Sequence, residues 1–189
     1  MGHAVGDRAV GLAVDGHHLI INYFVLGDQV VVTPTFLGAE PVHADRRQIC
    51  WPASFQSRRR SRARVGRARF RTRSAPRRSS RRRLPGEDFT TAFRDNLQLN
   101  YAGIRYDDLS KPQHDLLLNL VDYHVARMRS GHAQVKMAEV KQHLKDTYFC
   151  WMGGMADDGT FYYRVQSPVI IVEFDHQRGI AFRENDQAL

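Results

Sequence analysis

The chain has 189 residues, of which 42% are hydrophobic and 25% are charged, and its formal net charge is +8. This length suits one domain, or one domain with an appendage. No apolar run approaches the roughly 20 residues that a bilayer-spanning helix needs. The first residues lack the basic and apolar regions of a secretory signal. We therefore expect no membrane partner and take the cytoplasm as the default compartment.

The positive charge is concentrated in one segment. Residues 57–83 hold 14 arginines and no acidic residue, whereas the other 162 residues carry 14 basic and 20 acidic groups. The chain is therefore a mildly acidic globular sequence that is interrupted by one strongly basic stretch.

The N-terminal part of the chain, residues 1–45, is expected to form a β-hairpin. Residues 18–25 are β-branched and aromatic, as in strands, and residues 30–33 form a second such run. The residues between them include a glycine, which accepts the positive φ of hairpin turns. We expect residues 36–41 to be a loop.

Residues 46–86 show neither a strand period nor a helix period, and such a stretch buries too little apolar area to become ordered. We predict that they are disordered, and that residues 87–99 regain helical character. Three interpretations of the arginines stay open. They are a reading-frame artefact of G/C-rich coding sequence, because the chain has 24 Arg and only 4 Lys; a solvated linker; or a non-specific nucleic-acid contact. The third interpretation assigns the contact to Arg58, Arg59, Arg60, Arg81, Arg82 and Arg83.

Two helices are expected next. Ser110 and Gln113 have the spacing of a capping box, and apolar residues follow at helical intervals as far as Met128, with Gly131 as the stop. A second helix is expected from about Ala133 to Lys145.

Strands return after the helices, over residues 147–151, 160–166 and 169–175. The segregation of strands and helices favours an α+β fold, in which these three strands are antiparallel and join the sheet of the hairpin. Residues 87–182 are thus the C-terminal half of the domain, and residues 183–189 are a tail.

The side chains with chemical potential lie on the predicted strands. His17 and His18 alternate in direction if they begin a regular strand, so they cannot bind one metal ion together, but either one can act as a ligand or as a base. Tyr162, Arg164 and Gln166 share one face, where the guanidinium is suited to a carboxylate or phosphate. The structural alternative is that Arg164 pairs with an acidic side chain, Glu173 or Asp175. Adjacent Asp175 and His176 point apart, and Cys50 and Cys150 are expected to be free thiols.

Several ordered motifs are similar to those of the family of unknown function numbered 3500 (DUF3500). They are Gly16-His17-His18-Leu-Ile-Ile-Asn22, Thr33-Pro-Thr-Phe-Leu-Gly-Ala-Glu-Pro41, Trp151-Met-Gly153, Tyr162-Tyr-Arg-Val-Gln-Ser-Pro168 and Glu173-Phe-Asp175. The resemblance covers roughly residues 14–42 and 101–182. By this resemblance, the chain departs from the usual pattern of the family in three ways. A helical segment is replaced by the arginine run, Ser167 stands in the place of a usual Gly, and a C-terminal segment with a His-x-His pair is missing.

The resemblance implies an uncharacterised enzyme, metal-dependent or hydrolytic, that acts on a small-molecule substrate and is truncated and impaired in this chain. A divalent transition metal would be held by His17 or His18, with the missing histidines completing its site. The residues expected to be catalytic are His17, His18, Tyr163 and Arg164. Those expected to bind substrate are Asn22, Tyr162 and Gln166. Non-specific nucleic-acid binding and a non-catalytic domain with a disordered linker are the alternatives.

Overall fold

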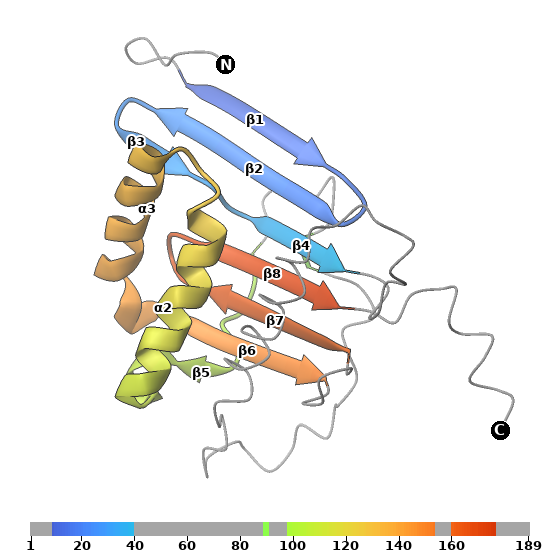
Figure 1. Cartoon of the computed structure of the whole chain (residues 1–189), viewed down its shortest axis with the longest axis vertical. Coiled ribbons are helices and arrows are strands. Elements are labelled where there is room, and N and C mark those ends of the chain that lie inside the picture. Colours follow the sequence, from blue (N-terminus) through green and yellow to red (C-terminus); the bar gives the residue numbers. More distant parts are fainter. Residues whose placement is uncertain (1–8, 40–88, 91–97, 154–159, 177–189) are drawn as a thin grey trace, which may run out of the picture.

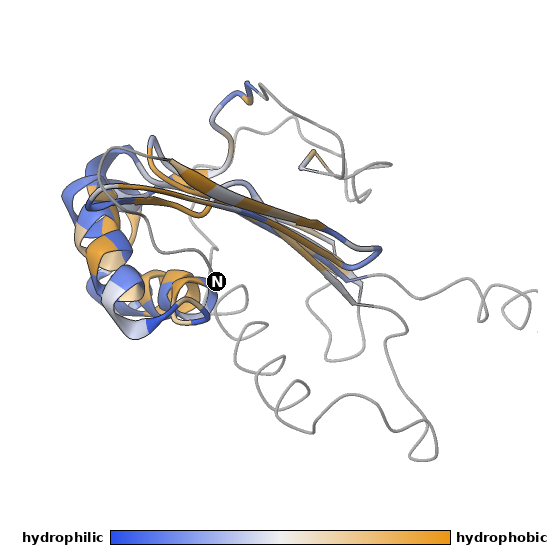
Figure 2. Ribbon diagram, turned by 90° about the horizontal axis from the view of Figure 1, so that it is seen from above, coloured by the Kyte–Doolittle hydropathy of each residue, from blue (hydrophilic) through white to orange (hydrophobic). Residues whose placement is uncertain are grey.

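The computed structural model describes residues 9–39, 89–90, 98–153 and 160–176 (Figure 1). These residues form one mixed eight-stranded sheet whose one face is covered by two α-helices (Figures 1 and 2). The strands are β1 (Val10–Asp15), β2 (Leu19–Leu26), β3 (Gln29–Val31), β4 (Thr35–Ala39), β5 (Ile104–Arg105), β6 (Tyr148–Gly153), β7 (Phe161–Gln166) and β8 (Ile171–His176). The helices are α2 (Lys111–Val125) and α3 (Ser130–Gln142), with short 3-10 turns η1 (Tyr106–Asp108) and η2 (Leu144–Asp146). The predicted α+β class is confirmed.

The sheet has the strand order β1-β2-β4-β8-β7-β6-β5, and β3 pairs with β2 beside this path. Strands β6, β7 and β8 are antiparallel neighbours, as predicted for the C-terminal part of the chain. The parallel pairing of β4 with β8 joins the N-terminal hairpin to the C-terminal strands within one sheet.

The prediction of a loop over residues 36–41 is wrong for residues 36–39, which belong to β4 (Thr35–Ala39) in the interior of the sheet. Phe36 and Leu37 are 4% and 5% exposed. Burial of these two side chains and pairing with β8 outweigh the local turn signals of Pro34 and Gly38, because β-structure depends strongly on its neighbours. The edge strand β1, which pairs with β2 along six residues, was also not predicted.

The first predicted helix is confirmed with its capping interaction. Gln113 Oε1 accepts the backbone N–H of Ser110 at 2.8 Å, which satisfies one donor at the start of α2. The predicted stop at Gly131 is wrong, because α2 ends at Val125 and Gly131 lies in the first turn of α3. A short turn follows Val125 and carries Met128 onto the core, so the apolar spacing continues beyond the end of the helix.

The hydrophobic core lies between the helices and the sheet. Its fully buried side chains include Leu117 and Val121 of α2, Val140 of α3, and Tyr163 and Val165 of β7. Figure 2 shows the helices gathered on one side of the sheet. None of the helices in the described part of the chain is long and apolar enough to cross a membrane.

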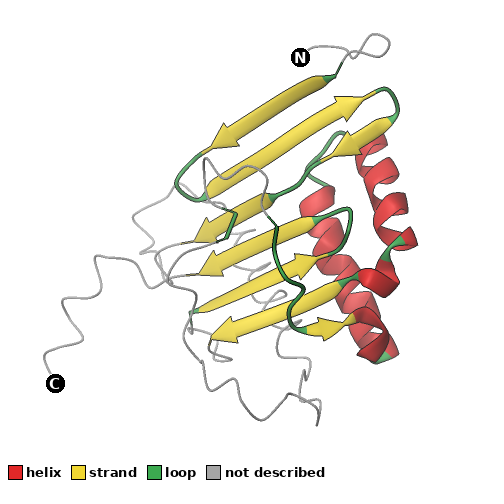
Figure 3. Cartoon of the chain, turned by 180° about the vertical axis from the view of Figure 1, so that it is seen from behind, coloured by secondary structure: helices red, strands yellow, loops and turns green. Residues whose placement is uncertain are grey.

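The opposite face of the sheet is polar. We call it the polar face and define it by Cys150, Tyr162, Arg164, Gln166, Glu173 and Asp175, which alternate with core residues along β6, β7 and β8. The described residues 89–90 and 98–103 run across this side, in front of the sheet in Figure 3. The predicted disordered segment (46–86), most of the predicted helix at 87–99 and the tail at 183–189 lie outside the described residues.

Candidate functional site

The polar face carries its ionisable side chains in two neighbouring rows that run across the strands. One row is Cys150, Arg164, Glu173 and Phe36, and the next is Met152, Tyr162, Asp175 and Gly38. Side chains of register partners on one face lie next to one another, because neighbouring strands are about 4.8 Å apart. The sheet therefore brings together residues from four strands that are distant in sequence.

Glu173 is 0% exposed and is held by three donors. Its Oε2 accepts the backbone N–H of Thr90 at 2.7 Å and also the Thr90 hydroxyl, and its Oε1 accepts the hydroxyl of Tyr162. A buried carboxylate needs such donors to offset the loss of water. These bonds tie the chain at Thr90 to the centre of the polar face.

Arg164 lies beside Glu173 in the sheet and is 6% exposed. Its Nη2 donates to the carbonyl oxygen of Asn100 at 3.1 Å, and its guanidinium carbon lies 5.1 Å from the centre of the Phe89 ring. Within the described residues it makes no ion pair, and its Nε has no hydrogen-bond partner there. The structural alternative predicted from the sequence was that Arg164 pairs with an acidic side chain such as Glu173. The hydrogen bonds to the Glu173 carboxylate come instead from Tyr162 and Thr90.

Two further groups complete this end of the face. Gln166 Nε2 donates to the carbonyl oxygen of Leu99 at 2.8 Å, so Gln166 and Arg164 hold consecutive backbone carbonyls of one segment.

Burial raises the pKa of the Cys150 thiol above its usual range, and the nearby Arg164 charge only partly opposes this. The thiol therefore stays protonated at neutral pH and is a weak nucleophile.

His17 and His18 do not begin a regular strand, contrary to the prediction. They occupy the bend between β1 and β2, where their ring centroids are 4.3 Å apart. The His18 ring lies on Gly38, because a Cβ added to Gly38 would be only 2.6 Å from His18 Nδ1. His18 thus reaches the row that contains Asp175 and Tyr162, whereas His17 is exposed.

The other predicted residues are placed apart from this cluster. Tyr163 lies on the helix side, where its hydroxyl is 2.9 Å from His124 Nε2 of α2. Asn22 Nδ2 donates to the carbonyl oxygen of Pro34 at 3.0 Å and holds the connection into β4. The structure therefore places His18, Tyr162, Arg164 and Gln166 on one face of the sheet, in successive rows, and Tyr163 on the other.

Sequence reasoning missed two contributors, Thr90 and Gly38, and it also missed the position of Asp175 in the row of Gly38. The alternation along β8 does predict that Asp175 and His176 diverge, and the His176 ring lies 5.1 Å from that of Phe161 on the helix side. No local signal places Asp175 next to Gly38, 137 positions away, because the parallel β4–β8 pairing creates that proximity.

Metal and nucleic-acid contacts remain predictions. No group of three His, Cys, Asp or Glu side chains in the described ranges is arranged to hold a metal ion. His17 and His18 could supply two ligands at most. The predicted nucleic-acid arginines, residues 58–60 and 81–83, lie outside the described residues.

The fold and the site define an α+β domain with a single mixed sheet, helices on one face and a buried polar cluster on the other. The model of the family described as protein of unknown function (DUF3500) matches residues 1–187, and the chain belongs to this family. The predicted resemblance is thus confirmed, and the matched range also includes residues 43–100. No curated protein and no solved structure matches the chain.

Proposed function

We propose that the polar face binds a small anionic molecule and that the protein is an enzyme that acts on this molecule by acid–base chemistry of a hydrolytic kind. The observation that carries this proposal is Arg164, a guanidinium that is 6% exposed and forms no ion pair within the described residues.

A buried guanidinium is costly unless an anion compensates its charge. Glu173, the register partner of Arg164, keeps its negative charge, but its oxygens accept hydrogen bonds from Tyr162 and Thr90, and it makes no ion pair with Arg164. The planar fork of an arginine fits a carboxylate or a phosphate with two parallel hydrogen bonds. The Nε of Arg164, which has no hydrogen-bond partner within the described residues, is one of the donors of that fork. These features support a role for Arg164 as the clamp of an anionic ligand.

The neighbouring groups suit proton transfer. The pKa of Tyr162 is raised far above its usual range, first by burial and then by the charge of Glu173 and the hydrogen bond to it. Tyr162 therefore stays a hydrogen-bond donor at neutral pH. His18 supplies the group whose ordinary pKa is nearest to neutrality, which is what a general base requires.

The experiment is a ligand screen by thermal shift and calorimetry, with inorganic phosphate and succinate as probes. A ligand at 100 times its Kd stabilises the folded state by about 2.7 kcal/mol, which a melting curve detects. We expect Arg164→Gln to abolish the shift and Arg164→Lys to weaken it, because lysine keeps the charge without the fork. Arg129→Gln, at an exposed arginine before α3, is the control. Equal shifts in all four proteins would contradict the proposal.

A metal ion at His17 or His18 is the second form of the proposal, and it is supported by the contact between their rings. Imidazole nitrogens bind Zn²⁺ and Cu²⁺, and further ligands would have to come from outside the described residues. Titration with Zn²⁺ and Cu²⁺, followed by thermal shift, tests this. A shift that is lost in His18→Gln supports it, and no shift in the unmodified chain counts against it.

The basic segment supports non-specific nucleic-acid binding as an alternative function, because dense arginine releases counterions from phosphates. That alternative predicts binding that weakens steeply with salt and disappears when residues 57–83 are deleted. A deletion variant that binds equally well would eliminate it.

A further inference from the structure

We infer that Arg164 and Gln166 form a two-point subsite for a short carboxylic acid that also carries an O–H or N–H donor. Arg164 binds the carboxylate, and the amide oxygen of Gln166 accepts the hydrogen bond of the donor. The inference deepens the proposed function and rests on it for the anion at Arg164. It adds the chemical class of the ligand and a residue that selects this class.

The first observation is a buried amide oxygen at Gln166. This residue is 5% exposed, and its Nε2 donates to the carbonyl oxygen of Leu99 at 2.8 Å. A carbonyl oxygen only accepts hydrogen bonds, so this contact fixes which end of the amide is nitrogen. The other end, Oε1, is buried and has no hydrogen-bond partner within the described residues. Because a buried acceptor without a donor is costly, Oε1 is suited to a donor that a ligand supplies.

The second observation is the complementary atom on Arg164. Its Nε only donates, and it too is buried without a partner in the part of the chain that the structure describes. Arg164 and Gln166 are two positions apart on β7, so they share the polar face at a spacing of about 6.6 Å along the strand. A donor and an acceptor thus lie on neighbouring side chains and do not bond to each other. A ligand with one acceptor and one donor satisfies both atoms.

The segment that crosses the polar face draws the two side chains toward each other. Arg164 Nη2 donates to the carbonyl oxygen of Asn100 at 3.1 Å, and Gln166 donates to that of the preceding residue, Leu99. The Cα atoms of consecutive residues are about 3.8 Å apart, which is less than the spacing of the two side chains along β7. Their polar ends are therefore held within the span of one small molecule.

The groups on the neighbouring strands limit the chemistry of the ligand. The register partners of Gln166 are Tyr148 and Ile171, so largely apolar side chains flank its amide. The register partner of Arg164 on β8 is Glu173, whose negative charge repels a second negative charge on the ligand. A single carboxylate at Arg164, joined by a short carbon chain to a hydroxyl, amine or amide donor at Gln166, fits these surroundings.

Malate and succinate are the matched probes, because malate is succinate with one added hydroxyl group. Calorimetry on the unmodified full chain should show that one enantiomer of malate binds about tenfold more tightly than succinate, which is the gain expected from one hydrogen bond. An ordered water molecule on Oε1 of Gln166 is the alternative. It predicts Kd values for the two acids within about twofold of each other, and that result would overturn the inference.

Gln166→Met separates the selection of the ligand from a structural role. Methionine keeps an unbranched side chain but has no amide oxygen, so the preference for malate should fall to within about twofold while succinate still binds. A purely structural role would change both Kd values by the same factor and keep their ratio, which would overturn the inference. Gln142→Met, at an exposed glutamine at the end of α3, is the matched control and should keep the full preference.

A second measurement reads the amide directly in the unmodified chain, and it stands even where Gln166→Met does not fold. The side-chain amide signals of Gln166 in labelled protein are assigned through their bonds to the backbone. At saturation with malate, these signals should move further than at saturation with succinate. Equal movement with both acids would overturn the role of the amide oxygen.

The outcomes separate this inference from the proposed function. Equal binding of malate and succinate that is lost in Arg164→Gln would overturn the two-point subsite and leave Arg164 as the anion clamp. If the unmodified chain binds neither acid and no phosphate, the proposed function and this inference are both overturned.

Discussion

Tyr162 donates its hydroxyl to Oε1 of Glu173, and both side chains are 0% exposed. The next residue, Tyr163, is also 0% exposed, but its hydroxyl contacts His124 on the other side of the sheet. Two consecutive tyrosines therefore serve different purposes. One holds a buried carboxylate on the polar face, and the other docks α2 onto β7.

Replacing each tyrosine by phenylalanine should separate the two faces. Tyr162→Phe leaves Oε1 of Glu173 without its donor, so we expect a loss of about 1.5–3 kcal/mol in the free energy of unfolding and weaker phosphate binding. Tyr163→Phe should cost about 1 kcal/mol and leave phosphate binding unchanged. Urea unfolding and calorimetry give both quantities. Weakened binding in Tyr163→Phe alone would instead favour the site that the family resemblance implied.

The stability of the protein should fall in alkaline solution. The pKa of Tyr162 in the folded state is raised above the ordinary value of 10.0 by burial, by the Glu173 charge and by the Glu173 hydrogen bond. Above pH 10 the unfolded chain loses this proton and the folded chain keeps it, so unfolding is favoured as pH rises. The contribution approaches about 1.4 kcal/mol per pH unit. Unfolding free energies between pH 8 and 11 should fall less steeply in Tyr162→Phe than in the unmodified chain.

Gly103 and Gly131 should respond oppositely to alanine. Gly103 has φ of +95°, and a Cβ there would overlap the backbone carbonyl of Phe149. We expect Gly103→Ala to destabilise the fold by more than about 2 kcal/mol. Gly131 lies in the first turn of α3 with nothing within 4 Å of an added Cβ, so alanine should be neutral or stabilise by up to about 1 kcal/mol. A similar loss of unfolding free energy in both variants would contradict this reasoning.

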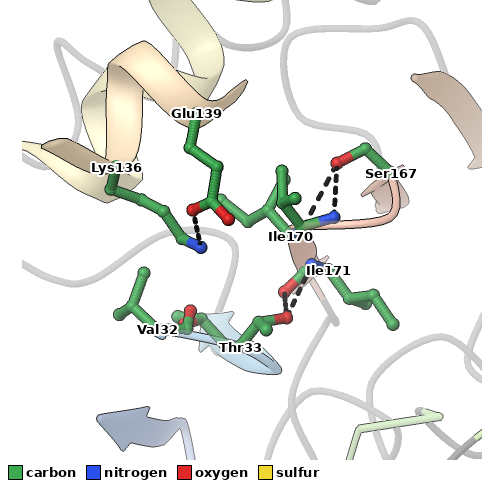
Figure 4. Close-up of polar contacts among 9 residues, drawn as sticks. Val32, Thr33, Lys136, Glu139, Ser167, Ile170 and Ile171 are labelled. Carbon is green, nitrogen blue, oxygen red and sulfur yellow. Dashed lines mark hydrogen bonds and ion pairs between the residues drawn. The ribbon is translucent and has the colours of Figure 1, made fainter. Parts of the chain in front are cut away.

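The ion pair of α3, in which only the lysine is buried, provides another test. Lys136 is 1% exposed, and its Nζ lies 2.6 Å from Oε2 of the partly exposed Glu139. Figure 4 shows Lys136 reaching from α3 toward Val32 and Thr33, with Glu139 beside its ammonium group. Removing the partner leaves a buried charge uncompensated, so we expect Glu139→Gln to cost about 1–3 kcal/mol.

Lys136→Met is the matched variant for this pair, because it removes the charge and keeps an unbranched apolar chain. We expect its free energy of unfolding to stay within about 1 kcal/mol of that of the unmodified chain, or to rise. Urea unfolding measures both variants. A larger loss in Lys136→Met than in Glu139→Gln would show that the ammonium group itself stabilises this region.

Local patterns were sufficient for elements that carry their own signals. The capping residues Ser110 and Gln113 mark the start of α2, and runs of β-branched and aromatic residues mark β2, β7 and β8. Alternation along β7 correctly placed Tyr162, Arg164 and Gln166 on one face. The same alternation placed Tyr163 on the opposite face of the sheet, whereas the family resemblance implied that Tyr163 and Arg164 belong to one site.

Patterns failed where stability comes from distant partners. Nothing local distinguishes β4 from a loop, since Pro34 and Gly38 are typical turn residues. Its pairing with β8, in which register partners lie 137 positions apart in the chain, decides its conformation. The same holds for the bond between Thr90 and Glu173.

The sequence by itself determined the α+β class, the family, the helix start and the face of β7 that carries Arg164, because these follow from short-range periodicity and motif order. Only the tertiary structure decided that His18, Gly38, Asp175, Tyr162 and Glu173 lie on one surface. The physical reason is that a parallel strand pair brings residues together by hydrogen bonds between segments far apart in the chain, and neither residue type nor spacing encodes its register.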